Sequence, residues 1–158
     1  MKFTRFAVLA VASAAAAFAQ LPTTKVLTVE VAQAIATESM LKCRADGYKV
    51  TVLVVDAGNK MKAFVRDDGA MPATIDIARM KANSVILFGR ASGPPPNAPA
   101  NAPIPPPILP DTINFQGGMP IQAGGQTIGV VAVSGAPGGD KDAVCANFAL
   151  NKLADKLK

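Results

Sequence analysis

Two runs of the sequence are apolar at nearly every position, and they restrict the fold more than any other feature. Residues 49–55 read KVTVLVV, and residues 127–134 read TIGVVAVS. β-Branched residues favour strands, and a strand without polar alternation must be buried on both of its faces. Each run therefore predicts a strand inside a sheet that has helices packed on both sides.

Each apolar run is expected to pair with a neighbouring strand through a short turn. Residues 60–66 follow the first run after the turn at 56–59, and residues 119–123 precede the second run before the glycines at 124–125. Short connections of this composition are typical of β-hairpins. The sequence therefore predicts two hairpins that join into one antiparallel sheet.

Three further segments have the apolar spacing of amphipathic helices. They cover residues 28–46, about 74–88 and 140–157, with Thr28 and Asp140 as predicted N-caps. Helices before, between and after the two hairpins can cover both faces of the sheet. We therefore expect an α/β/α sandwich of the α+β class, built around one core.

The first nineteen residues have the pattern of a secretory signal peptide. Lys2 and Arg5 precede an apolar run at residues 6–17, and residues 17–19 (AFA) form a small-x-small cleavage pattern. The run is too short to span a bilayer comfortably. We expect a periplasmic or secreted protein whose single domain occupies residues 20–158, without a transmembrane segment.

The composition excludes several classes of function. The chain has no histidine, the side chain that most often serves as general base, zinc ligand or activator of a nucleophile. Aromatic residues make up only 5% of the chain, and loss of the first nineteen residues would reduce the net charge from +5 to +3. We therefore expect no nucleic-acid partner and recognise no metal-ligand cluster.

The two cysteines, Cys43 and Cys145, lie in the first and last predicted helices. In an oxidising compartment such a pair is a candidate for a disulfide. The alternative is two buried thiols that pack as small hydrophobic side chains. The sequence favours the disulfide because the protein is expected to be exported.

A proline-rich run occupies residues 94–110 and contains nine of the 13 prolines in the chain. Such a run cannot enter a helix or the interior of a sheet. It is predicted to be one long extended loop within the domain. Two interpretations remain open, a stiff loop that folds back over the domain and a motif that binds a partner.

One lysine, Lys81, falls on the inward face of the second predicted helix. A buried lysine needs a carboxylate partner or an anionic ligand. A salt bridge to Asp56 or Asp68 is the structural interpretation. In the functional interpretation, Lys81 and Arg66 together bind a carboxylate or a propionate.

Six short motifs follow one another along the chain. They read VVDAG (54–58), AFxRxDGA (63–70), IAxxKA (77–82), FG (88–89), GGMPI (117–121) and IGVVAVSG (128–135). In this order and spacing they resemble the GlcG/HbpS family of haem-binding proteins. The resemblance covers nearly all of the chain after the first nineteen residues.

The resemblance implies a profilin-like α/β/α sandwich that assembles into dimers and larger oligomers. It also implies that some members bind haem or a related tetrapyrrole. Secreted members resemble haem scavengers or redox-sensing accessories of membrane sensor kinases, whereas others accompany glycolate or diol metabolism without a settled activity.

The main functional hypothesis is therefore a secreted module that binds haem without catalytic turnover. Because histidine is absent, haem would need a methionine, Tyr48, a lysine or a cysteine as iron ligand, or would bind weakly in a groove. Met71, Met80 and Met119 offer soft thioether sulfurs. Arg66 or Lys81 would meet the propionates.

Two alternatives belong to other classes. The first is a binder, sensor or enzyme for a small carboxylate metabolite, with Asp56 or Asp68 as base and Lys81 as electrostatic partner. The second is an oligomeric scaffold whose proline-rich loop docks a partner.

Overall fold

The computed structural model describes residues 23–95, 97–99, 101 and 109–158. The expected signal peptide at residues 1–19 lies outside this part of the chain. So do residues 96, 100 and 102–108 of the proline-rich run.

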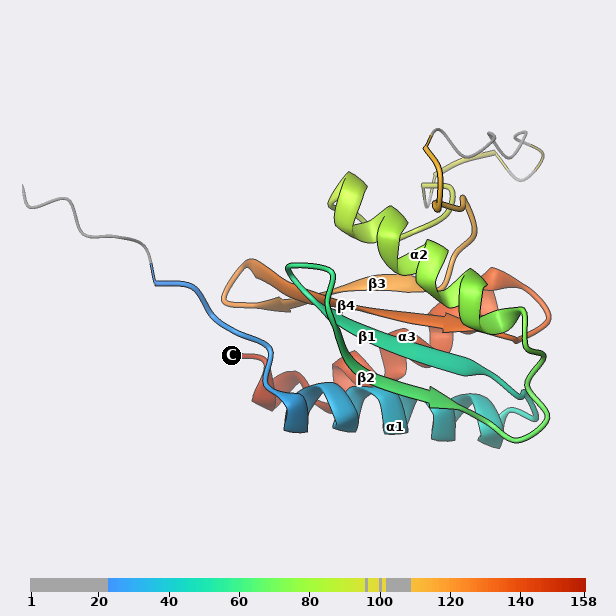
Figure 1. Ribbon diagram of the computed structural model, residues 1–158, viewed down its shortest axis with the longest axis horizontal. Coiled ribbons are helices and arrows are strands. Elements are labelled where there is room, and N and C mark those ends of the chain that lie inside the picture. The colour runs from blue at the N-terminus through green and yellow to red at the C-terminus, as the bar shows by residue number, and fades with distance from the viewer. Residues whose placement is uncertain (1–22, 96, 100, 102–108) are drawn as a thin grey trace, which may run out of the picture.

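Three α-helices and one four-stranded antiparallel sheet are formed by the described residues, which confirms the expected α+β class (Figure 1). A single 3₁₀ turn, η1, follows the last helix. In chain order the elements are α1 (Val29–Ala45), β1 (Thr51–Asp56), β2 (Met61–Arg66), α2 (Thr74–Phe88), β3 (Gly118–Ala123), β4 (Gln126–Ser134), α3 (Gly139–Lys152) and η1 (Ala154–Lys156).

The strand order in the sheet is β2-β1-β4-β3. The two apolar runs lie side by side at its centre, where Val52 pairs with Val133 and Val54 with Val131. The partner strand of each hairpin forms an edge. The prediction of two hairpins joined into one antiparallel sheet is therefore confirmed.

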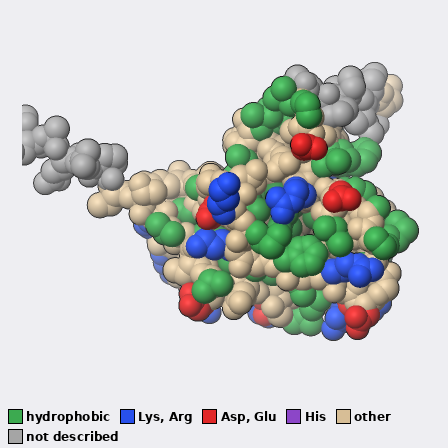
Figure 2. Space-filling view, viewed as in Figure 1, with side chains coloured by type: hydrophobic (Ala, Val, Ile, Leu, Met, Phe, Trp, Pro, Cys, Tyr) green, Lys and Arg blue, Asp and Glu red, His purple; other side chains and the backbone are tan. Residues whose placement is uncertain are grey.

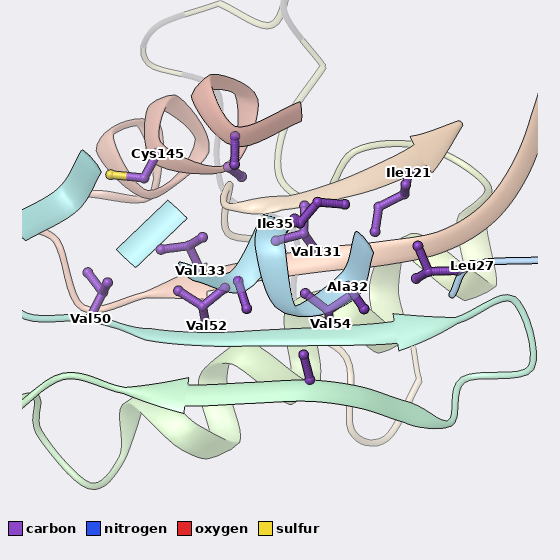
Figure 3. Close-up of a cluster of buried hydrophobic side chains, with 14 of the residues drawn as sticks. Leu27, Ala32, Ile35, Val50, Val52, Val54, Ile121, Val131, Val133 and Cys145 are labelled. Atoms are coloured by element: carbon purple, nitrogen blue, oxygen red, sulfur yellow. The ribbon is translucent and has the colours of Figure 1, made fainter. Parts of the chain in front are cut away.

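Alternate residues of the central strands bury opposite faces of the sheet. Val52 and Val54 point into a core shared with α1 and α3, whose side chains are drawn in Figure 3. Leu53 and Val55 belong to a second core, beneath α2. Figure 1 shows the same layers, with α2 on one side of the sheet and α1 and α3 on the other. The central strands lack polar alternation because both of their faces are buried, as the sequence predicted.

The ends of the first two helices agree with their predicted signals. Thr28 caps α1 and accepts a hydrogen bond from the backbone N–H of Val31. Gly89 ends α2 with a φ of 65°, a conformation that glycine adopts without strain.

The third helix differs from its prediction at both ends. Asp140 lies within the first turn of α3 and caps nothing, because the N-cap position belongs to Gly138. A carboxylate in the first turn still interacts favourably with the helix dipole. The α-helix ends at Lys152 instead of residue 157, and the chain tightens there into η1.

A disulfide joins Cys43 of α1 to Cys145 of α3, as the sequence predicted. Both side chains are fully buried, and the two Cα atoms are 5.5 Å apart. The alternative of two free thiols is therefore wrong. The bond connects the two helices on one face of the sheet.

The surface mixes charged and apolar side chains. In Figure 2, lysine and arginine side chains on the viewed face are separated from one another by apolar and acidic ones, so positive charge does not accumulate there. None of the helices among the described residues is long and apolar enough to cross a membrane.

Candidate functional site

The most unusual polar group of the fold is the ion pair between Lys81 and Asp142. Lys81 lies on the inward face of α2, and Asp142 lies in the first turns of α3, on the other face of the sheet. The lysine Nζ donates to Asp142 Oδ2 at 2.6 Å and to the carbonyl oxygen of Val133 at 2.9 Å. Lys81 is only 2% exposed and Asp142 only 3%. The two helices are therefore joined by a buried ion pair.

Burial shifts the titration of both partners in the direction that favours their neutral forms. It lowers the pKa of Lys81 and raises the pKa of Asp142, although the attraction between the two charges acts against both changes. Asp142 is held in place by a second bond, because its Oδ1 accepts from the backbone N–H of Ala136 at 2.9 Å. Both carboxylate oxygens of Asp142 thus accept a hydrogen bond.

Gly117 leaves the room that this pair needs. Its φ is 120°, and a Cβ placed on it would lie 2.7 Å from Lys81 Nζ and 2.8 Å from Asp142 Cβ. Both contacts are too short for a methyl group. The first glycine of the GGMPI motif is therefore explained by the close approach of the ion pair.

A cavity of about 320 Å³, which we call the Lys81 cavity, opens beside the pair. The N-terminal half of α2 and the loop before α3 provide most of its wall. The lining residues are Met71, Thr74, Ile77, Lys81, Phe115, Ser134, Gly135, Ala136, Gly138, Gly139 and Asp142. The ion pair is therefore buried from bulk solvent but adjoins a space that a small molecule can fill.

The expected partners of Lys81 were wrong. Asp56 instead holds the turn of the first hairpin, where its Oδ1 accepts from the N–H groups of Gly58 and Lys60. Asp68 is exposed after β2. The reason is topological, since Lys81, at the middle of α2, contacts Val133 near the carboxyl end of β4 and Asp142 at the start of α3.

Arg66 also has a different environment from the one expected. Its guanidinium donates to the carbonyl oxygen of Ala70, which ties the end of β2 to the following loop. It is not among the residues that line the Lys81 cavity. Arg66 and Lys81 therefore do not form one anion-binding pair.

Sequence reasoning missed Asp142, although a signal for it existed. Asp142 precedes Cys145 by three residues and Ala146 by four, and both of these side chains are fully buried. Residues at such spacing share one helix face. An acidic residue on the inward face of the last helix was therefore a candidate partner for an inward-facing lysine.

A second, larger hollow lies beside β3 and the first half of α3. We call it the Met119 groove; its volume is about 450 Å³. Its lining residues are Arg90, Ala91, Ser92, Pro94, Pro95, Gln116, Met119, Asp140, Ala143, Val144 and Asn147. Most of this wall is apolar, with one cationic side chain, Arg90, and one acidic side chain, Asp140.

The methionines that the sequence suggested as ligands are separated by the fold. Met119, half-buried on β3, lines the Met119 groove. Met71 lines the Lys81 cavity and is 68% exposed. Met80 lines neither hollow. No cluster of three or more acidic or cysteine side chains that could hold a metal ion occurs within the described ranges.

Comparison with family models gives a match to the family described as haem-degrading protein, HbpS-like, over residues 27–151. The chain belongs to the HbpS-like family. The match spans almost the whole described domain, and it confirms the resemblance that the six motifs indicated. Comparison with curated proteins gives no match.

Solved structures of HbpS are similar to this chain. One crystal structure of HbpS shares 30% identity, with 89% of this chain and 99% of that chain covered and a TM-score of 0.72. A double mutant of HbpS from Streptomyces reticuli shares 31% identity, with coverages of 91% and 98% and the same TM-score of 0.72.

More distant structures share the fold. The crystal structure of a PduOC:heme complex is 18% identical, with coverages of 80% and 94% and a TM-score of 0.67. Protein ORFY from Klebsiella pneumoniae is 24% identical, with coverages of 87% and 97% and a TM-score of 0.70.

Proposed function

We propose that this protein binds haem or a related tetrapyrrole in the Met119 groove. The main support for the proposal is the chemistry of the groove wall, where the thioether of Met119 and the guanidinium of Arg90 lie among apolar side chains. Membership of the HbpS-like family and the PduOC:heme complex among proteins of the same fold support it.

The residues of the groove fit the chemical requirements of a haem without histidine. Met119 offers a thioether sulfur, which is an axial ligand in cytochromes c. Arg90 offers a cation for a propionate, while Pro94, Ala143 and Val144 offer apolar surface for the macrocycle. Haem supplies the iron and its redox chemistry, and the residues of this chain hold and orient it.

The Lys81 cavity fits haem less well than the Met119 groove does. Its ammonium already donates to Asp142 and to the carbonyl of Val133, so it has no free charge to offer a propionate. Its volume is also smaller, about 320 Å³ against about 450 Å³. These differences favour the Met119 groove.

A hemin titration of the purified protein tests the proposal. We expect a Soret band that differs in position and intensity from free hemin, with saturation at one equivalent of hemin per chain. Met119→Leu should remove the shift of the Soret band relative to free hemin, because leucine has a similar volume to methionine but lacks the sulfur. Arg90→Gln should weaken binding without moving the band.

Met71→Leu is the matched control, since Met71 is the exposed methionine of the other hollow. We expect it to retain the wild-type spectrum. A Soret band identical to that of free hemin would remove haem as the ligand. A spectrum lost in Met71→Leu and retained in Met119→Leu would overturn the assignment to the Met119 groove.

We also propose that the protein is exported and acts outside the cytoplasm as a haem scavenger or redox-sensing accessory. The buried Cys43–Cys145 disulfide supports export, because such bonds persist in oxidising compartments. N-terminal sequencing of the protein from periplasmic and culture fractions tests this, with Gln20 as the expected first residue. A full-length chain confined to the cytoplasm would contradict it.

A further inference from the structure

The Lys81 cavity contains an amine, a carboxylate and an adjoining space, and the proposed haem binding uses none of them. Lys81 Nζ and Asp142 Oδ2 are 2.6 Å apart, so a proton can pass directly between them. Three other lysines form ion pairs of similar length, Lys42 with Asp46 at 2.6 Å, Lys152 with Glu38 at 2.7 Å and Lys158 with Asp155 at 2.5 Å. All three of those pairs lie at the surface, where water solvates the ammonium.

The charge of this site argues against an anionic guest. The ammonium of Lys81 is balanced by Asp142, so the pair brings no net positive charge to the cavity. The remaining wall combines the apolar side chains of Met71, Ile77 and Phe115 with the backbone of residues 134–139. A neutral, partly apolar molecule with one polar group is the guest that matches this lining.

We propose that Lys81 is a nucleophilic amine that condenses with small aldehydes carrying an apolar group, with Asp142 as its proton acceptor and donor. The lysine is desolvated, and its proton acceptor is already in hydrogen-bond contact. These are the conditions under which buried lysines form Schiff bases. The lowered pKa of Lys81 and the raised pKa of Asp142 act in the same direction, because both favour transfer of the proton to the carboxylate.

The reaction balances without an oxidant or a reductant. The ammonium first gives a proton to Asp142 Oδ2, and the free amine attacks the carbonyl carbon to form a C–N bond. Asp142 then protonates the carbonyl oxygen and takes a proton from the nitrogen. Finally it protonates the hydroxyl group, the C–O bond breaks, and water leaves. The products are a protonated imine on Lys81, an ionised Asp142 and one water molecule.

Reductive trapping of the full chain tests this inference without haem. The protein is incubated with benzaldehyde and cyanoborohydride at neutral pH, and peptide mass spectrometry follows the modification of each lysine over time. We expect Lys81 to be modified at least about ten-fold faster than Lys152 or Lys42, because its amine is the one that a buried carboxylate can deprotonate. Reactivity governed by exposure alone predicts the reverse order, since the Lys152 side chain is 51% exposed and that of Lys81 only 2%.

Two variants separate the chemistry from a structural role. Lys81→Arg should abolish the fast modification and leave the slow surface reaction unchanged. Asp142→Asn should slow the modification of Lys81 at least about ten-fold, with circular dichroism used to check that the fold is retained. If Asp142→Asn does not fold, the relative modification rates of the lysines in the wild-type protein test the inference by themselves. Modification of Lys81 at or below the rate of Lys152 overturns the inference, whatever the outcome of the hemin titration.

Discussion

Lys81 and Asp142 reach each other from helices on opposite faces of the sheet, and the lysine Nζ also donates to the carbonyl oxygen of Val133 near the carboxyl end of β4. Of the ion pairs found between described residues, this one alone joins α2 to a helix of the other layer. The contact therefore connects the two outer layers directly, whereas the two cores are separated by the sheet.

The ion pair should show strong energetic coupling. Removal of one partner leaves the other as an uncompensated buried charge, which typically costs about 3–5 kcal/mol of unfolding free energy. We expect losses in this range for Lys81→Met and for Asp142→Asn. Their double variant should lose clearly less than the sum of the two, as measured by urea unfolding.

The exposed pair between Lys152 and Glu38 is the matched control for this double-mutant cycle. Its two atoms are at nearly the same distance, 2.7 Å, but both side chains contact solvent. Coupling of about 0.2–1 kcal/mol is expected there. Equal coupling in the two cycles would contradict the importance of burial for the Lys81–Asp142 pair.

The disulfide should make a large contribution to stability because the loop it closes is long. Cys43 and Cys145 are 102 residues apart, and the chain-entropy model assigns roughly 4–5 kcal/mol to a loop of this length. The Cys43→Ala/Cys145→Ala variant should unfold at correspondingly lower urea concentration than the oxidised wild type. Wild-type protein unfolded in the presence of a reductant provides the comparison, and an unchanged midpoint in both samples would show that the bond adds no stability.

The layers of this fold could be predicted because their cause is local. The run at residues 49–55 carries no polar alternation, and only a sheet buried on both faces accommodates it. The disulfide could be proposed for a similar reason, because the first and last helices each carry one cysteine. The prediction of the disulfide also used the signal-peptide pattern, because that pattern implies an oxidising compartment.

The site could be predicted only in part, because its contacts depend on tertiary structure. The inward position of Lys81 follows from helical spacing, but its partner lies 61 residues further along the chain and on another layer. Asp56 and Asp68 were the predicted partners, yet Asp56 holds the turn of the first hairpin and Asp68 is exposed after β2. Arg90 was missed because its position in the Met119 groove is set by the loop that follows α2.

Gly117 should tolerate no side chain. An alanine there would combine an unfavourable φ of 120° with contacts below 3 Å to both members of the ion pair. We expect Gly117→Ala to destabilise the protein by more than about 2 kcal/mol in urea unfolding. Gly69→Ala is the control, because its φ is also positive, at 83°, but a Cβ there would meet nothing within 4 Å. Similar losses of unfolding free energy in the two variants would mean that backbone strain alone causes the effect.

The contact between α1 and the loop after β2 should make stability depend on pH in the acid range. The guanidinium of Arg44 donates to both oxygens of Asp67, at 2.7 and 3.2 Å, and it lowers the pKa of this carboxyl below its ordinary value of 3.8. A lowered pKa in the folded state means that the contribution is complete above pH 3.8 and is lost as the pH falls through the folded-state value. Urea unfolding of wild type and Asp67→Asn should therefore show a difference that is constant near neutrality and shrinks below pH 3.8. Arg44→Gln should reproduce the same pH dependence, because it removes the donor instead of the acceptor. A difference between wild type and Asp67→Asn that stays constant across the acid range would rule out this linkage.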